Sequence, residues 1–233
     1  MGNVISANLG QAPARQACLE AGLPEKTICT TVNKVCSSGL KSITMAAQTI
    51  QLKQANVILA GGMESMSNAP YYLEKGRTGY GYGHGSVIDA IIKDGLWDPK
   101  YQIHMGECAE ETAINYEISR SQQDEYAISS YKRAAEAVKN GIFKNEIVPI
   151  VVKNKKQEIV ISEDEEFKKI DFSKVSGLKS AFKKDGTVTA ANASTLNDGA
   201  SSIMLASKEY VEAHSLKPIA KILCMKLLIY SLC

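Results

Sequence analysis

The sequence predicts an α/β protein in which short buried strands alternate with helices. Residues 28–32 form an apolar run that ends in a turn, and residues 56–60 form a second run closed by Gly61 and Gly62. Between these runs, apolar residues at helical spacing predict one buried helix face: Leu40, Ile43, Ala47 and Ile50. Because strands joined by a helix form βαβ units, we expect these buried strands to be parallel.

The same patterns predict the remaining elements. Residues 11–22 (QAPARQACLEAG) indicate an amphipathic helix that ends at Gly22. Two longer helices are predicted over residues 106–117 and 121–140, the second with Ser121 as its N-cap. Apolar runs and helical spacing predict further short elements: strands over residues 147–152, 158–161 and 200–206, a helix over 208–214, and a strand from 219.

Two segments do not fit helix or strand patterns. Residues 68–102 are rich in glycine, tyrosine and proline, and GYGYGHG at 79–85 excludes an ordinary helix or strand. Their aromatic residues favour a packed functional loop over a disordered segment. Residues 162–174 (SEDEEFKKIDFSK) form a charged loop, and their composition alone favours a solvent-exposed face.

Composition excludes several classes of protein. The 233 residues are 45% hydrophobic and 22% charged, as in ordinary soluble globular proteins. A net charge of +2 gives no general attraction to nucleic acid or to a membrane surface. No apolar run reaches the roughly 20 residues of a transmembrane helix. The six scattered cysteines and three histidines show no metal-ligand spacing, which favours a reducing intracellular compartment.

A cysteine stands where the first predicted strand turns into its helix. Cys36 follows the turn at residues 33–35 and precedes Ser37, Ser38 and Gly39. The first N–H groups of a helix lack intrahelical partners and form the positive end of its dipole, which stabilises a thiolate. Small neighbours also leave room for a substrate carbonyl. The position predicts a nucleophile, with a buried structural cysteine as the alternative.

The sequence motifs around Cys36 favour the nucleophile. Several stretches closely resemble the thiolase family: NKVCSSGLKS at 33–42, LAGGMESMS at 59–67, IHMG at 103–106, FSK at 172–174 and TVTAANASTLNDGA at 187–200. The resemblance runs from Met1 to about Leu223. It implies that Cys36 accepts an acetyl group from acetyl-CoA as a thioester.

The resemblance also implies a fold and a domain organisation. Family members have two similar halves stacked as five α-β-α-β-α layers, with a loop domain inserted in the first half. Residues 1–65 and 195–215 correspond to most of the N-terminal half, and residues 66–194 correspond to the loop domain that holds coenzyme A. Residues 216–233 correspond to the start of the C-terminal half, followed by a tail (CMKLLIYSLC) without family likeness.

By the same resemblance we expect a chain truncated at both ends. Family members carry about one more strand and helix before the match to Met1, and a whole second half beyond Leu223. That half holds the histidine that activates the nucleophile, a second cysteine that moves the proton at the acetyl α-carbon, and one of two oxyanion donors. The Cys36 N–H corresponds to the other donor. We therefore expect little turnover from this chain alone.

Binding positions also carry over from the family. Residues that contact the nucleotide part of coenzyme A correspond to Lys169, Ile170, Asp171, Lys174 and Ser194. Residues that wall the acyl pocket correspond to His104 and Met105. The potassium site of mitochondrial members corresponds to Tyr131, Ala190, Ala191 and Ala193. The lysines supply cationic donors for a phosphorylated adenosine, although the family often has arginine where Lys169 stands.

The function that the resemblance implies is that of an acetyl-CoA C-acetyltransferase of fatty acid metabolism, which cleaves acetoacetyl-CoA or condenses two acetyl-CoA. Residues 72–89 resemble the loop through which family members form homotetramers. The match to the potassium site of mitochondrial members indicates a mitochondrial location, with the cytosol as the alternative. Two other functions stay open: a catalytically incomplete fragment that binds coenzyme A or partner subunits, and a 3-ketoacyl-CoA thiolase of broader chain length. Met105 argues for a small acyl pocket.

Overall fold

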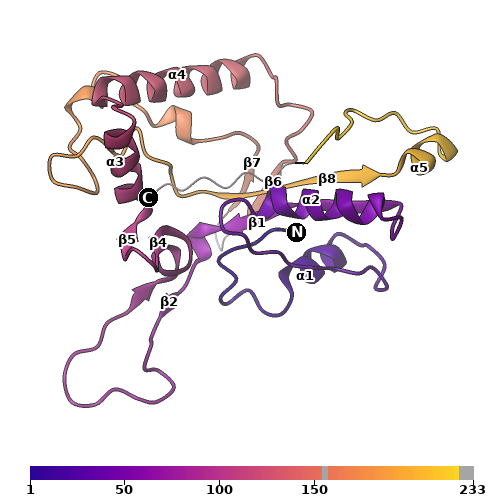
Figure 1. The fold of residues 1–233 in the computed structure, drawn as a ribbon, viewed down its shortest axis with the longest axis horizontal. Helices are drawn as coiled ribbons and strands as arrows, with labels where there is room; N and C mark the ends of the chain where they lie inside the picture. Colours follow the sequence, from indigo (N-terminus) through magenta and orange to yellow (C-terminus); the bar gives the residue numbers. More distant parts are fainter. Residues whose placement is uncertain (154–156, 226–233) are drawn as a thin grey trace. The chain divides into compact units, whose positions relative to one another are not determined.

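The structure is a computed structural model that describes residues 1–153 and 157–225 (Figure 1). Its contacts divide the chain into two units. The first unit comprises Met1–Gln102 and Leu196–Cys233, and the second comprises Ile103–Thr195. Each unit contains both helices and strands, as the predicted α/β class requires.

The first unit contains two longer helices and the long strand pair. Its elements are α1 (Pro13–Glu20), α2 (Ser38–Gln51), β1 (Val57–Ser65), the 3-10 helix η1 (Met66–Asn68), β2 (Tyr71–Tyr72), β3 (Ile88–Asp89), the π-helix η2 (Ile91–Leu96), β4 (Trp97–Asp98), β8 (Asp198–Ala206) and α5 (Lys208–Ala213). The helices predicted over residues 11–22 and 208–214 are thus confirmed with shorter bounds. In the described residues after 213 no strand begins, so the strand predicted from 219 is wrong.

The second unit contains the longest helix and a short antiparallel ribbon. Its elements are β5 (Ile103–His104), α3 (Met105–Asn115), α4 (Arg120–Lys139), β6 (Ile150–Lys153), β7 (Glu158–Ile161) and the 3-10 helices η3 (Glu166–Lys168) and η4 (Val175–Gly177). The predicted N-cap of α4 is wrong by two residues. Ser119, not Ser121, caps the helix, because its hydroxyl accepts the Gln122 N–H while the Gln122 side chain accepts the Ser119 N–H.

The sheet of the first unit is built around β1. β8 lies antiparallel beside β1, with Val57 opposite Ala206 and Ser65 opposite Asp198. The opposite edge of β1 is bridged in parallel by Gly2, which also bridges Val32 in parallel. The prediction of a parallel strand at 56–60 therefore holds only for the Gly2 bridge, and the long partner of β1 is antiparallel.

The predicted strand at residues 28–32 is reduced to an extended segment. Val32 takes part in a bridge, and its N–H donates to the Met1 carbonyl at 2.9 Å. Ile28 at the other end of the segment is 95% exposed. The segment is therefore paired only at its C-terminal end, next to the turn that leads to Cys36.

α2 packs on β1 through small residues. The core cluster joins Ala46 and Ala47 of the helix to Ala60 and Leu205 of the strands. The prediction that Leu40 is buried is wrong, since its side chain is 68% exposed. Helical spacing identifies a face only to within one position, and here the buried side contains small residues that allow a close approach of helix to sheet.

Exposed segments account for the other differences from prediction. Residues 73–87, inside the loop expected to be packed, are all exposed, because only the base of this loop is paired, through β2 and β3. β7 has the predicted bounds, and β6 starts three residues later than predicted. Apart from Leu205 and Ala206, the strand predicted as buried over residues 200–206 is exposed.

The two units differ in extent from the domains that the resemblance implies. Residues 66–102, expected in the loop domain, belong to the first unit, where the Ser67 N–H donates to the Asp198 carboxylate at 2.9 Å. The functional assignment of the domains stays a prediction. Among the described residues, the helices are all too short or too polar to span a bilayer.

Candidate active site

Cys36 is an exposed thiol directly before α2. The preceding residue, Val35, has a φ of 47°. A left-handed backbone is strained for a β-branched residue and persists only where the surroundings hold it. Such strain often accompanies functional sites, because a sharp turn presents one side chain to solvent. The exposed thiol excludes a buried structural cysteine, and the role of nucleophile stays a prediction.

Side chains hold this turn on both sides of Cys36. The Val35 N–H donates to the Asn33 side-chain oxygen at 3.0 Å. The Ser38 hydroxyl accepts the Lys34 N–H at 2.7 Å and donates to the Val35 carbonyl at 2.6 Å. The Ser37 hydroxyl donates to the Lys34 carbonyl at 2.9 Å. These neutral contacts fix the turn without using the Cys36 thiol.

The start of α2 lies backbone to backbone on the sheet. A Cβ at Gly62 would lie 3.2 Å from the Gly39 Cα, and a Cβ at Gly2 only 2.5 Å from the Gly39 nitrogen. The Ser42 hydroxyl, which is buried, donates to the Gly61 carbonyl at 2.7 Å and accepts the Gly61 N–H at 3.0 Å. The close approach at the glycines and the bonds of Ser42 therefore hold the start of α2, which follows Cys36, against the sheet.

In the second unit, His104 begins α3. The His104 Nδ1 accepts the Gly106 N–H at 2.9 Å. The backbone N–H of His104 donates to the Glu107 carboxylate at 2.9 Å. The imidazole stacks on Phe182 with ring centroids 4.9 Å apart. Met105 is 37% exposed beside it. The cap fixes the ring, so His104 can form a wall of a pocket but its Nδ1 is already occupied.

The two lysines expected to contact phosphate lie on an exposed loop. Lys169 Nζ is 3.2 Å from the Glu166 carboxylate, and Lys174 Nζ is 3.0 Å from that of Asp171. The hydroxyl of Ser173, and then Lys174, lower the pKa of Asp171. Both lysines are more than half exposed, so these ion pairs are weak and exchangeable for another anion.

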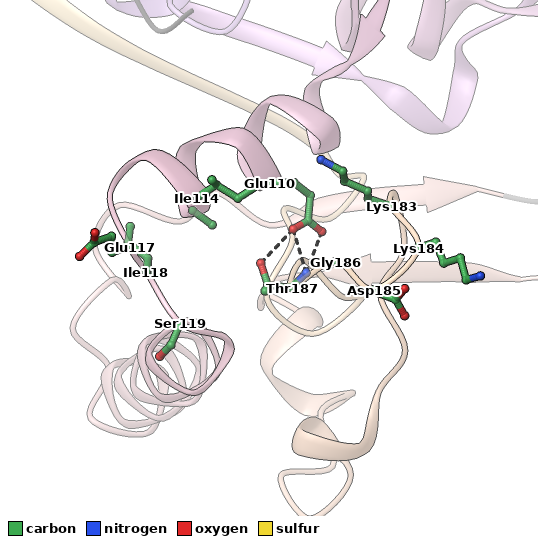
Figure 2. Close-up of a pocket in the computed structure, with 11 residues that line it drawn as sticks. Glu110, Ile114, Glu117, Ile118, Ser119, Lys183, Lys184, Asp185, Gly186 and Thr187 are labelled. Carbon is green, nitrogen blue, oxygen red and sulfur yellow. Dashed lines mark hydrogen bonds between the residues drawn. The ribbon is translucent and has the colours of Figure 1, made fainter.

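A buried carboxylate holds the loop that contains the predicted alanines. Glu110 of α3 is 2% exposed. It accepts the Thr187 N–H at 2.8 Å and the Thr187 hydroxyl at 2.9 Å (Figure 2). It also accepts the Val188 N–H at 2.8 Å. Burial alone raises the pKa of a carboxyl, but these bonds, helped by Lys183, outweigh it and lower the pKa of Glu110. The charged form thus holds the loop to α3.

A second buried carboxylate joins the same loop to α4. Asp124 accepts the Asn192 amide at 2.9 Å and the Arg120 guanidinium at 2.8 Å. Asn192 in turn accepts the Thr189 N–H at 2.7 Å. Arg120 also donates to the carbonyls of the turn that contains η4. This network fixes the backbone of the loop that contains Ala190, Ala191 and Ala193, which are predicted to bind potassium, and Ser194, which is predicted to contact coenzyme A.

Those loop residues differ in exposure. Ala190 and Ser194 are exposed, Ala193 is half-buried and Ala191 is buried. Tyr131 lies two turns beyond Asp124 on the same side of α4, half-buried, and burial and then the charge of Glu166 raise its pKa. Tyr131 is therefore a neutral phenol. α4 carries Tyr131 and, through Asp124 and Asn192, also holds the loop that contains the three alanines. The potassium site itself stays a prediction. Ile170 is half-buried beside Lys169.

A cavity of about 260 Å³ lies beside the bonds between Glu110 and Thr187 (Figure 2). It is lined by α3, the start of α4 and the turn before Thr187, and it contains none of the residues predicted to bind coenzyme A. Sequence reasoning also missed Ser42, which joins α2 to β1, and the three residues that hold the loop at 187–194: Glu110, Asp124 and Asn192. The Gly61-Gly62 pair was the one signal of a close backbone approach, whereas partners such as Glu110 and Thr187 are 77 residues apart.

Comparisons with known proteins agree with this geometry. Residues 1–209 match the family model described as thiolase, N-terminal domain. The chain therefore belongs to the thiolase family. A solved thiolase from Ascaris suum in complex with coenzyme A superposes with a TM-score of 0.89 and 47% identity, over 96% of this chain and 57% of that one. The thiolase-like α/β fold expected from the sequence is thus confirmed.

Curated relatives are acetyl-CoA acetyltransferases. That of Yarrowia lipolytica is 55% identical over 88% of this chain and 51% of its own length. The mitochondrial acetyl-CoA acetyltransferase of Rattus norvegicus is 55% identical over 95% of this chain and 52% of its own length. The mitochondrial enzyme of Homo sapiens is 52% identical. The chain spans about half the length of these relatives.

Proposed function

We propose that this chain carries the acyl-accepting part of an acetyl-CoA C-acetyltransferase. The observation that carries the proposal is Cys36, an exposed thiol on a strained, hydrogen-bonded turn at the start of α2. The identity to acetyl-CoA acetyltransferases over most of the chain supports the same substrate class.

The chemistry proposed for Cys36 is one transthioesterification. The Cys36 sulfur attacks the thioester carbonyl of acetyl-CoA, a new S–C bond forms, and the bond to the coenzyme A sulfur breaks. The proton of Cys36 goes to the departing thiol, so the products are acetyl-Cys36 and free coenzyme A. Donors that face the carbonyl oxygen stabilise the tetrahedral intermediate, and the Cys36 N–H is the donor that this chain supplies.

Coenzyme A binding is proposed for the second unit. Lys169 and Lys174 would exchange their weak partners for phosphate oxygens, with Ile170, Asp171 and Ser194 beside them. His104 and Met105 would wall the acyl end. The Ascaris suum thiolase in complex with coenzyme A supports this ligand class.

A potassium site is proposed at Tyr131, Ala190, Ala191 and Ala193. Backbone carbonyls and a neutral phenol are suitable donors for a weakly hydrated monovalent cation. The loop that carries the alanines is held by the Glu110 and Asp124 networks, which would keep such carbonyls in place. Bound potassium would order this loop and take no part in acyl transfer.

An assembly and a location are also proposed by analogy with the family. We infer a homotetramer formed through the exposed loop at residues 72–89, and a mitochondrial location, since relatives from Rattus norvegicus and Homo sapiens bear that name. Sedimentation of the chain with residues 76–86 replaced by a short linker tests the first inference, and a tetramer that persists would contradict it.

The test of the acyl-transfer proposal is intact-mass spectrometry after incubation with acetyl-CoA. We expect one acetyl adduct on the wild-type chain, lost in Cys36→Ala and retained in Cys224→Ala, whose cysteine is also exposed. Binding of coenzyme A to the same samples, measured by calorimetry, shows that they are folded. A folded chain that binds coenzyme A without forming the adduct would instead indicate a catalytically incomplete fragment.

The breadth of the acyl pocket is tested by the same adduct. Acetyl-, hexanoyl- and decanoyl-CoA are compared at equal concentration. A preference for the acetyl group supports the acetoacetyl-CoA type, and faster labelling by longer chains would support a broader 3-ketoacyl-CoA thiolase. Met105→Ala, which opens the predicted pocket wall, should shift the preference toward longer chains.

A further inference from the structure

Two cysteines outside the candidate active site, Cys18 and Cys29, interact through their side chains. Cys18 of α1 is 8% exposed, and Cys29 is partly buried. Burial raises the pKa of the Cys18 thiol, and the neighbouring Cys29 side chain raises it further. The Thr27 hydroxyl also bonds Cys18, and the Cys29 thiol donates to the Thr27 carbonyl at 3.5 Å.

Two hydrogen bonds that involve side chains hold the segments that carry these thiols together. The Ala14 N–H, one turn before Cys18, donates to the Thr31 hydroxyl at 3.1 Å. The Arg15 guanidinium donates to the Thr27 carbonyl at 2.7 Å. These two bonds fasten α1 to residues 27–31 on both sides of Cys29. The segments that carry the two cysteines are thus held together at two points.

We propose that Cys18 and Cys29 form a dithiol modification site that hydroperoxides oxidise to a disulfide, independently of Cys36. The two residues would close a loop of only about a dozen residues, and their side chains already interact in the reduced chain. Cys29 is the more accessible of the two and reacts first, and Cys18 resolves the product.

The reaction balances with hydrogen peroxide as the oxidant. The Cys29 sulfur attacks one peroxide oxygen, the O–O bond breaks, and a sulfenic acid and one water form. The Cys18 sulfur then attacks the sulfenic sulfur, the S–O bond breaks, and the hydroxide leaves with the Cys18 proton as a second water. Two thiols are oxidised to one disulfide while one peroxide is reduced to two waters.

The disulfide has a structural consequence for the candidate active site. Residues 27–32 lead directly into the turn before Cys36, and Val32 is bonded to Met1 and Asn3. A bond between Cys18 and Cys29 joins α1 covalently to that segment. The site therefore responds to oxidants without consuming the nucleophile, whereas oxidation of Cys36 itself would remove the acyl acceptor.

Peptide mapping of the full chain tests the proposal, because trypsin separates the three cysteines. Cleavage after Arg15, Lys26, Lys34 and Lys41 places Cys18, Cys29 and Cys36 on different peptides. The reduced chain is treated with hydrogen peroxide, alkylated with iodoacetamide and mapped without reductant. We expect the linked peptides 16–26 and 27–34 as the main cross-link, with peptide 35–41 recovered unlinked.

Two variants make the result decisive. In Cys36→Ala the cross-link should form at the wild-type rate. In Cys29→Ser it should vanish, while Cys18 stays a thiol that iodoacetamide alkylates after denaturation. A main cross-link that contains Cys36, or a Cys29 that is over-oxidised while Cys18 stays a thiol, would overturn the proposal. Loss of the cross-link in Cys36→Ala would show exchange through the nucleophile and would overturn it equally.

Discussion

The two units position their candidate residues by different means. In the first unit, the turn before Cys36 is held by hydroxyl, amide and glycine contacts, all of them neutral. In the second unit, the loop at 187–194 is held by two buried carboxylates, Glu110 and Asp124. A nucleophile is thus placed by close backbone packing, and a binding loop by buried charge.

This difference separates what each unit tolerates. Neutral contacts in close packing are sensitive to added volume and insensitive to pH. A buried carboxylate that accepts several N–H bonds is sensitive to pH, and its removal leaves buried donors without partners. Substitutions that act on one unit alone can therefore break or sharpen the comparison.

The largest effect is expected from Glu110→Ala. The change leaves the Thr187 and Val188 N–H groups without their acceptor and should lower the free energy of unfolding of the second unit by about 3 kcal/mol. Hydrogen exchange should accelerate in residues 103–115 and 183–195 and stay unchanged in residues 38–65.

The neighbouring Glu111→Ala is the matched control for this prediction. Glu111 forms an exposed ion pair with Lys183 at 3.0 Å, so its loss should change stability by less than about 1 kcal/mol. Equal destabilisation by the two variants would show that charge in general, and not the bonds to the loop, stabilises the second unit.

The next effect is the response to acid. Because the pKa of Glu110 in the folded chain is lowered below its ordinary 4.5, its contribution to stability is present above that pH and is lost as the pH falls through the lowered value. The second unit should therefore open first on acidification, and Glu110→Gln should flatten its pH dependence.

Asp198 sets the limit of this comparison, because the first unit also has a carboxyl with a lowered pKa. The Ser67 hydroxyl is the largest cause at Asp198, but the residue is exposed, so its contribution is smaller. Hydrogen exchange followed between about pH 6 and pH 3 distinguishes the units. Simultaneous opening of both units would contradict the expected order.

A smaller effect is expected from Ser42→Ala. The substitution removes the hydroxyl that bonds both polar groups of Gly61 and should cost the first unit about 1–2 kcal/mol. Because α2 then loosens from β1, the alkylation rate of Cys36 should change, while coenzyme A binding should not. Thr44→Ala, which removes an exposed hydroxyl from the same helix, is the control and should leave both unchanged.

Local sequence patterns predicted many of the helices and strands, but few of the tertiary contacts that hold them in place. Cys36 was found because the turn, the small residues and the helix start are adjacent in the sequence, and the helices at 106–117 and 208–214 were found because their periodicity is local. The exposure of Leu40 was missed because it depends on β1, which is distant in sequence. The Glu110 and Asp124 networks were missed for the same reason, since a buried carboxylate is recognised only by partners that the fold brings to it.

The smallest expected effect concerns the exposed lysines of the second unit. Lys169→Ala removes one cationic donor from the proposed phosphate contact and should weaken coenzyme A binding several-fold, with a shallower salt dependence of the affinity. Lys168→Ala is the matched control, because Lys168 is also exposed and is paired with Glu163 at 2.6 Å. Calorimetry at two salt concentrations measures both. Equal losses in the two variants would indicate that the charge of the whole loop attracts the ligand, whereas a loss confined to Lys169 assigns it a direct contact. In either case the Cys36 turn should react with iodoacetamide at the wild-type rate, because it shares none of these charges.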